Sequence, residues 1–422
     1  MNGKIYVCID LKSFYASVEA VERKLDPMAV NLVVADKDRG TNAICLAITP
    51  AMKALGIKNR CRLSDIPADV KYHIAKPRMK LYMEYSAAIY KIYLRYVSKD
   101  DIHVYSIDEC FIDATDYLKL YKTTARKFAR TLIDKVYEEL GIRATVGIGT
   151  NLFLAKVALD ITAKHSPDFM GYLDEDKFKD EIWFHRPITD VWNIGRGIAA
   201  RLEKYGVYDL YGVAHTDEKF LYKEFGVNAE YLIDHANGVE PCTIADIHRY
   251  KAKSNSISNG QILFSDYSAE DAKTVMKEMV DLLVLELIEK GLVTNSISLY
   301  IGYSDRNAKA DGGTEKLDFY TNSYNKLKER FDEFFDRATD KKKKIRRINV
   351  GLLGVVPEEY ATVDLFTDAK ADLKEHNAQS AVLGIKKKYG KNAIMRGISF
   401  TEKATGRERN KMIGGHNGGE EQ

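Results

Sequence analysis

A series of short apolar segments within residues 1–150 most constrains what this chain can fold into. KIYVCID at 4–10 is typical of a buried strand that ends in an aspartate, because the apolar residues run up to the acid. IHVYS at 102–106 and CFIDA at 110–114 predict two further short strands, and ATVGIG at 144–149 predicts a fourth. Strands of this length are expected to pair in one sheet.

The helices predicted between these strands complete a known plan. Residues 79–97 and about 121–140 show the spacing of amphipathic helices. The resulting order, β-α-β-β-α-β, is that of the ferredoxin-like fold. In that fold the end of the first strand lies beside the central hairpin, so we expect Asp10 to meet Asp108 and Glu109 at one edge of the sheet.

The remaining residues divide by pattern. Residues 187–240 predict short helices joined by glycine turns, and 241–255 are polar and weakly periodic, which favours a linker. Residues 256–356 predict a second βαββαβ unit, with a long helix capped by Ser268. The residues from 357 to 422 end in a Gly-rich stretch and are expected to be irregular and partly disordered.

Composition excludes several classes of protein. A chain of 422 residues is too long for one ordinary domain. It has no apolar stretch near the roughly 20 residues that cross a bilayer, and its start leaves no room for a signal peptide, so a cytoplasmic location is expected. The five cysteines show no C-x-x-C spacing, which argues against zinc or a disulfide framework.

Two basic runs, 341–347 and 386–388, indicate either solvated surface or a nucleic-acid contact.

The three acids indicate a particular chemistry. Phosphoryl transfer to a 3′ hydroxyl uses two divalent cations about 4 Å apart. Magnesium prefers oxygen ligands, and crowded carboxylates such as Asp10, Asp108 and Glu109 are costly unless a metal is bound. The alternative is that Asp10 caps the following helix and the other two only form a turn.

Three motifs carry a family resemblance. YVCIDLKSFYASVE is followed by YSIDECFID and then by VGIGTNLFLAKVALDITAK. In this order and at these spacings the chain resembles the Y-family DNA polymerases over essentially its whole length. The ending RERNKMIGGH is similar to that of the UmuC-like branch of Gram-positive bacteria and their mobile elements.

This resemblance implies an α+β, multidomain, right-hand architecture. It has a ferredoxin-like palm, small fingers, a helical thumb with a helix-hairpin-helix and a βαββαβ little finger. The implied boundaries are palm 1–22 and 78–186, fingers 23–77, thumb 187–240, linker 241–255, little finger 256–356 and a C-terminal tail 357–422.

The resemblance also implies a metal and nucleotide site. Asp10, Asp108 and Glu109 match the family's catalytic metal ligands, and the carbonyl of Leu11 would complete a site for two Mg²⁺ ions, with Mn²⁺ able to substitute. The nucleotide-binding residues implied are Tyr15 as a steric gate against ribose, Phe14 behind it, and Lys156 and Lys53 toward the triphosphate.

The fingers depart from the family pattern at one place. Many members grip the triphosphate with a tyrosine and an arginine, where this chain has Pro50 and Lys53. Proline donates no hydrogen bond, and lysine keeps the charge without the bidentate fork. We therefore expect weaker nucleotide binding or support from elsewhere, for example Arg60.

Contacts with macromolecules follow from the same resemblance. The implied DNA contacts are a glycine turn in the thumb and a basic run in the little finger, comprising Gly195, Arg196, Gly197, Lys343, Lys344, Arg346 and Arg347. Alone, the basic run would be surface and the glycine turn a weak signal. Val363, Leu365 and Phe366 resemble the peptide by which bacterial polymerases dock on the sliding clamp.

The function implied is template-directed, low-fidelity DNA synthesis across lesions and damage-induced mutagenesis. Its partners would be primer-template DNA, dNTPs, the sliding clamp and accessory mutagenesis subunits. The small fingers, about 50 residues, are expected to check base-pair geometry loosely. Two alternatives stay open: a nucleotidyl cyclase, which shares the palm fold, and a non-catalytic DNA-binding relative.

Overall fold

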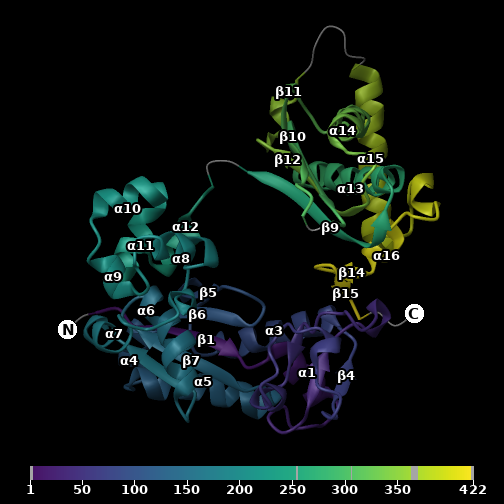
Figure 1. Ribbon diagram of the computed structural model, residues 1–422. Coiled ribbons are helices and arrows are strands. Elements are labelled where there is room, and N and C mark those ends of the chain that lie inside the picture. Colours follow the sequence, from purple (N-terminus) through teal and green to yellow (C-terminus); the bar gives the residue numbers. More distant parts are fainter. Residues whose placement is uncertain (1–2, 253–254, 306, 363–368, 420–422) are drawn as a thin grey trace. The chain divides into compact units, whose positions relative to one another are not determined.

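The computed structural model describes residues 3–252, 255–305, 307–362 and 369–419 (Figure 1). These residues form two compact units, one of residues 1–250 with 419 onward and one of residues 251–418. In the described part of the chain, every helix is too short or too polar to cross a membrane. The two units are described separately below.

A five-stranded sheet forms the centre of the first unit. Its order is β5 (Ile102–Val104), β6 (Glu109–Asp113), β1 (Tyr6–Leu11), β7 (Ala144–Gly149) and β8 (Met170–Leu173). The first four strands are antiparallel neighbours, whereas β8 runs parallel to β7. The predicted ferredoxin-like order is therefore confirmed, and β8 is an additional strand that the sequence did not predict.

Helices cover both faces of this sheet. On one face, α3 (Met79–Tyr93) lies against Ile9 and Leu11, with α5 (Ala125–Leu140) beside it. On the other face, α6 (Leu152–Val157) packs on Tyr6 and Cys8. The smaller elements of this region are α4 (Thr115–Leu120), η3 (Lys99–Asp101), η4 (Ala158–Thr162), η5 (Ala163–His165) and α7 (Glu175–Glu181).

Two glycines allow α6 to lie unusually close to β7. A Cβ on Gly147 would lie 2.0 Å from the carbonyl oxygen of Ala155, and one on Gly149 would lie 2.2 Å from the Ala155 nitrogen. Both neighbours are backbone atoms, which cannot move aside as a side chain could. The sequence VGIG is therefore needed to bring α6 and its lysine, Lys156, onto the sheet.

The predicted fingers form a small sheet of their own. Its order is β3 (Ala47–Ile48), β2 (Leu32–Val34) and β4 (His73–Ala75). Val33, Ile48 and Met52 form its core. α1 (Phe14–Glu22) contacts β2 and β3. The remaining elements are η1 (Lys37–Arg39), α2 (Pro50–Ala54) and η2 (Leu63–Asp65).

The segment predicted to be helical, 187–240, contains only helices among its assigned elements. They are η6 (Ile188–Asp190), α8 (Arg196–Glu203), α9 (Leu210–Ala214), α10 (Glu218–Phe225), η7 (Gly226–Asn228) and α11 (Ala229–Ala236). Leu202, Leu221 and Leu232 share a buried core with Phe153 and Phe178. The helices therefore pack directly on the α6 side of the sheet.

The expected linker is wrong in its first half. Residues 244–249 form α12 (Ile244–Arg249), which begins at a capping box between Thr243 and Asp246. Ile244 is buried against the same sheet face as Tyr6 and Cys8. Only two isoleucines, Ile244 and Ile247, pack here in an otherwise polar segment, and they gave too weak a periodicity to predict this helix.

The second unit contains the predicted βαββαβ order. Its elements are β9 (Ser256–Tyr267), α13 (Ala269–Lys290), β10 (Leu292–Tyr303), β11 (Asp311–Thr321), α14 (Tyr324–Ala338) and β12 (Ile345–Leu353), with β13 (Val356–Pro357) paired to β10. Ser268 caps α13 by accepting a hydrogen bond from the amide of Asp271, as predicted. The sheet order is β11-β10-β12-β9, and α13 and α14 pack against each other on one face (Figure 1).

The expected irregular tail is also wrong over most of its length. Its described residues form η8 (Glu358–Tyr360), α15 (Ala369–Tyr389), η9 (Gly397–Phe400), α16 (Gly406–Asn410) and the small hairpin of β14 (Met412–Ile413) and β15 (His416–Asn417). Polar contacts hold the tail against α13. The Glu278 carboxylate accepts hydrogen bonds from the backbone amides of Thr405 and Gly406 at 2.8 and 3.0 Å, and Arg396 forms an ion pair with Asp281 at 2.6 Å. Apolar periodicity could not reveal a segment that docks through charges.

Candidate active site

The structure brings the three predicted carboxylates together at one edge of the central sheet. Asp10 on β1 pairs directly with Glu109 on β6, so the two side chains lie on the same face. The amide of Leu11 donates to the carbonyl of Asp108 at 2.9 Å, which holds the third acid beside them. Burial, together with the charges of Asp108 and Glu109, raises the pKa of Asp10 to about 7.

Lys156 lies beneath this acidic edge. Its ammonium is 2.7 Å from Glu109 Oε1 and 3.1 Å from Asp160 Oδ2, and the Lys156 and Glu109 side chains are 9% and 8% exposed. Burial disfavours the ammonium, but Asp160 and Glu109 raise its pKa above the usual value. Cys8 Sγ also donates to Glu109 Oε1 at 3.3 Å. Here Lys156 is the counter-ion of Glu109, and its contact with a triphosphate stays a prediction.

The donor set suits a hard cation. Asp10, Asp108, Glu109 and the carbonyl of Leu11 offer only oxygen atoms, as magnesium prefers. The charges of Asp108 and Glu109 raise the pKa of Asp10, so the carboxylates interact electrostatically. As they stand, no three acidic, histidine or cysteine side chains in the described residues are arranged to hold a metal ion. One of the acids, Glu109, instead contacts Lys156 and Cys8 through Oε1.

The predicted steric gate lies next to these acids. Tyr15 stacks on Tyr82 with ring centroids 4.6 Å apart and an interplanar angle of 17°. The Tyr82 hydroxyl donates to Glu19 at 2.7 Å, which fixes the supporting ring. Burial and the charge of Asp108 raise the pKa of Tyr15, whereas Arg60 opposes this. Tyr15 is therefore close to both Asp108 and Arg60, and Phe14 is buried behind it.

Two lysines, Lys53 on α2 and Lys156 on α6, interact electrostatically with Asp10. Pro50 is the first residue of α2, and Lys53 lies in the last turn of the same helix. Burial lowers the pKa of Lys53; Asp10 opposes this effect and Lys164 adds to it. Lys164 is thus near Lys53, and 65% of its side chain is exposed. The sequence reasoning missed Lys164, although it stands in the same motif as Lys156.

The predicted DNA-contacting turn of the first unit is exposed. Gly195 is the N-cap of α8, and Arg196 and Gly197 follow in its first turn. The first amides of a helix have no intrahelical acceptor, so these groups are available to an anion. The geometry agrees with the predicted phosphate contact without testing it.

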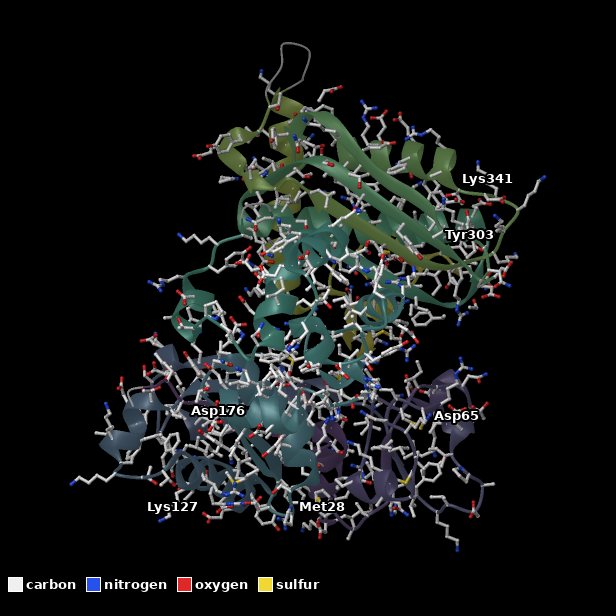
Figure 2. The ribbon with its side chains drawn as sticks, turned by 60° about the vertical axis from the view of Figure 1, so that its left-hand side comes forward. Met28, Asp65, Lys127, Asp176, Tyr303 and Lys341 are labelled. Atoms are coloured by element: carbon white, nitrogen blue, oxygen red, sulfur yellow. The ribbon has the colours of Figure 1, made fainter. Side chains whose placement is uncertain are left out.

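The predicted DNA contacts of the second unit lie at one end of its sheet. Lys343 and Lys344 are exposed in the turn before β12, and the Lys343 ammonium lies 5.0 Å from the centre of the Tyr303 ring. Figure 2 shows Tyr303 and Lys341 at this end of the sheet. Arg346 and Arg347 lie at a bulge where the register with β9 shifts. The Arg347 guanidinium lies over the Tyr300 ring at 5.6 Å, and exposed Ile262 and Phe264 belong to the neighbouring strand.

The predicted clamp-binding residues Val363, Leu365 and Phe366 lie outside the described residues. Just before them, Thr362 donates its amide to the carbonyl of Tyr320 at 3.0 Å. The predicted contact with a sliding clamp stays a prediction.

Comparison with known families decides the classification. Residues 9–160 match the impB/mucB/samB family and residues 254–365 match the C-terminal domain of the same family. The chain belongs to the impB/mucB/samB family. The predicted membership of the UmuC-like Y-family polymerases is therefore confirmed, and the cyclase alternative is set aside.

Similar proteins match this Y-family chain from end to end. A Bacillus subtilis protein named as a UV-damage repair protein, UvrX, is 31% identical and covers 98% of this chain and 97% of its own length. DNA polymerase IV 2 of Bacillus subtilis is 30% identical over 99% of both chains. DNA polymerase IV 2 of Halalkalibacterium halodurans is 29% identical over 98% of this chain and 99% of its own.

A solved structure supports the fold. A Y-family DNA polymerase chimera built from Dbh and Dpo4 has a TM-score of 0.63 to this chain at 20% sequence identity. It matches 84% of this chain and 99% of its own length. The α+β, multidomain polymerase fold predicted from the motifs is thus confirmed.

Proposed function

We propose that this chain is a template-directed, low-fidelity DNA polymerase that extends primers across damaged bases. The observation that carries the proposal is the convergence of Asp10, Asp108 and Glu109 on one sheet edge, beside a stacked Tyr15. Family membership supports it, since its relatives are named DNA polymerase IV and a UV-damage repair protein.

Two divalent ions are the proposed cofactors, magnesium with manganese as a substitute. Asp10, Asp108, Glu109 and the carbonyl of Leu11 would hold them. When bound, such ions activate the attacking hydroxyl and neutralise the leaving pyrophosphate. Lys156 orients the Glu109 carboxylate through their buried ion pair.

The nucleotide contacts follow from side chains around the acids. Tyr15 is braced by Tyr82, so its ring can exclude a ribose 2′ hydroxyl without moving. Lys53 interacts with Asp10 and with Lys164, and these two point charges would attract the triphosphate in place of the missing tyrosine and arginine. Arg60 near Tyr15 would add to this attraction.

Binding of primer-template DNA would be independent of sequence. The exposed amides at the start of α8 and the cations Lys343, Lys344, Arg346 and Arg347 are suited to phosphates, which carry no base information. We further propose docking on a sliding clamp through Val363, Leu365 and Phe366, cooperation with accessory mutagenesis subunits, and action in the cytoplasm at damaged DNA.

Primer extension tests the proposed function. The purified chain would be given a primed template, dNTPs and Mg²⁺, in parallel with Asp108→Ala and with Asp116→Ala, an exposed acid on α4, as the matched control. We expect extension by the wild type and by Asp116→Ala and none by Asp108→Ala. Extension by Asp108→Ala equal to that of the control would contradict the two-metal assignment, and binding without any extension would favour the non-catalytic alternative.

A further inference from the structure

The end of the tail carries a concentration of positive charge that the polymerase site does not use. Residues 386–411 contain nine Lys and Arg residues against two Glu, although the whole chain has a net charge of only +3. These residues belong to the end of α15, to η9 and to α16, all in the second unit. The charge is therefore concentrated rather than evenly spread.

Five of these nine cations have structural partners. Lys387 pairs with Glu289, Lys411 with Glu408 and Arg396 with Asp281, while Arg409 donates to Asn259 and Lys386 donates to the carbonyl of Lys391. These contacts attach the tail to the rest of the unit. They account for part of the charge only.

The other four cations, Lys388, Lys391, Lys403 and Arg407, lack a strong acidic partner. Within the described part of the chain, the carboxylate nearest to any of them is that of Glu402, 3.8 Å from Lys403 and 90% exposed. Lysines at the end of a helix such as α15 are often explained by the helix dipole. Arg407 lies in the five-residue helix α16 and, in the described part of the chain, forms no ion pair with a carboxylate.

Hydrogen bonds join these cations into one surface. Asn392 donates to the carbonyl of Arg407 at 3.2 Å, and Asn410 donates to Asn392 Oδ1 at 2.8 Å. The start of α16 therefore lies beside the end of α15, although the two are separated in the sequence. We call Lys388, Tyr389, Lys391, Phe400, Lys403 and Arg407 the tail patch.

Two exposed aromatic rings belong to the tail patch. Tyr389 is 67% exposed and Phe400 is 63% exposed, so both rings are accessible to a ligand. A cation accompanies each ring: Lys388 lies 5.2 Å from the Tyr389 ring and Arg407 lies 5.4 Å from the Phe400 ring. Exposed rings alternating with unpaired cations are the composition of surfaces that bind single-stranded nucleic acid, where bases stack and phosphates are neutralised.

We propose that the tail patch is a second DNA-binding surface, which binds single-stranded DNA separately from the polymerase site. The cations neutralise phosphates and the two rings stack on unpaired bases. A duplex offers phosphates but no exposed base faces, so the rings favour a single strand. This inference goes beyond the proposed polymerase reaction, because it needs neither nucleotide nor metal.

Fluorescence anisotropy of a labelled oligo-dT tests it, with the full chain and no metal or dNTP present. One variant replaces Lys388, Lys391, Lys403 and Arg407 with Ala. The matched control replaces four exposed palm lysines, Lys99, Lys119, Lys122 and Lys127, with Ala. Each phosphate contact made by a Lys or Arg side chain releases counterions from the single strand and contributes about 0.7 to the slope of log K against log salt. We expect the tail variant to weaken binding by about tenfold or more and to lower that slope by about 2 to 3, beyond any effect of the control.

A second variant, Tyr389→Leu with Phe400→Leu, separates stacking from charge. We expect it to weaken oligo-dT binding by about a hundredfold with an unchanged salt slope, because each of the two lost stacking contacts is worth about a factor of ten. Thermal melting by circular dichroism confirms that each variant is folded. Equal affinity and slope for the tail variant and its control would overturn the proposal. Loss of binding to phosphatidylserine vesicles with oligo-dT binding intact would also overturn it, in favour of a membrane partner.

Discussion

The two sheets of this protein are built from the same order of elements and place their strands differently. In the first unit, the strand order β5-β6-β1-β7 puts the first strand between the third and the fourth. In the second unit, the order β11-β10-β12-β9 puts the first strand, β9, at an edge beside the fourth. Only the first arrangement makes the first and third strands neighbours.

That difference decides what each sheet can do. Because β1 and β6 are neighbours, Asp10 lies directly opposite Glu109, and helices on both faces keep the pair partly buried. In the second unit, the end of β9 pairs Tyr267 with Ile345, which serves packing. Tyr300, Ile262 and Arg347 remain on exposed positions of that sheet. The same element order thus gives a buried acidic site in one unit and an exposed, basic sheet surface in the other.

The largest effect is expected where the first sheet concentrates charge. Asp10→Asn keeps the shape of the side chain and removes one carboxylate, so primer extension should fall by about 10²–10³-fold or more. Binding of primed DNA should be unchanged within about twofold, since it depends on distant cations. Steady-state primer extension and anisotropy, measured on the same preparation, separate the two. If Asp10→Asn lost DNA binding along with activity, the carboxylate site and the DNA-binding cations would not act independently.

Glycines in the two sheets should respond differently to a methyl group. Gly147→Ala places Cβ against the backbone of Ala155 and Leu159 and should destabilise the chain by about 3 kcal/mol. Gly260→Ala, in the second sheet, meets only the Asn349 side chain, which can rotate away. Urea denaturation compares the two variants. Equal destabilisation would show that the close approach of α6 is not a strict requirement.

Buried carboxylates join elements in both units, and Glu19 offers a test by pH. Burial alone would raise its pKa, but hydrogen bonds from Arg78, Arg23 and Tyr82 lower it. Its charged form therefore stabilises the fold above the unfolded pKa, and this contribution is lost as the pH falls through the lower, folded pKa.

Replacing this carboxylate tests that contribution. Glu19→Gln should cost about 2 kcal/mol near pH 7, because hydrogen bonds to a charged group are lost. The difference from wild type should shrink toward zero in acid. Thermal melting of both proteins from pH 7 into acid measures this difference in stability. If the charge of Glu19 is unimportant, the difference will stay constant with pH.

The smallest effect is expected on the exposed sheet surface. Arg347→Ala should weaken binding of primed DNA a few-fold and reduce the salt slope by about 0.9, the value for one duplex phosphate contact. Lys290→Ala, at the end of α13, is the matched control and should leave the slope unchanged. If both variants behave alike, the DNA lies elsewhere on this unit.

The predicted core of the active site followed from strand patterns, because an acid after an apolar run marks the end of a buried strand. The sequence placed Asp10, Asp108 and Glu109 together and identified both βαββαβ orders. It did not distinguish the two strand orders, since both satisfy the same apolar periodicity. Choosing between them depends on how helices pack on each face, which a local pattern does not contain.

Other features were missed because they depend on contacts distant in sequence. Lys156 was expected to be available to a triphosphate, and only the close approach of α6 to β7 shows that it is buried against Glu109. α12 packs on the sheet through only two apolar residues, Ile244 and Ile247. The tail packs on α13 through polar contacts of Glu278 and Arg396, and such contacts produce no apolar periodicity in the sequence.

The docking of the tail also sets the order of events during synthesis. Glu278 lies in the middle of α13, yet the amides it accepts belong to Thr405 and Gly406, made more than a hundred residues later. Until those residues leave the ribosome, the buried carboxylate of Glu278 lacks these two hydrogen-bond donors. By then all strands of the first unit's central sheet have already been made. The first unit can therefore finish folding while the second waits for Thr405 and Gly406 to be made.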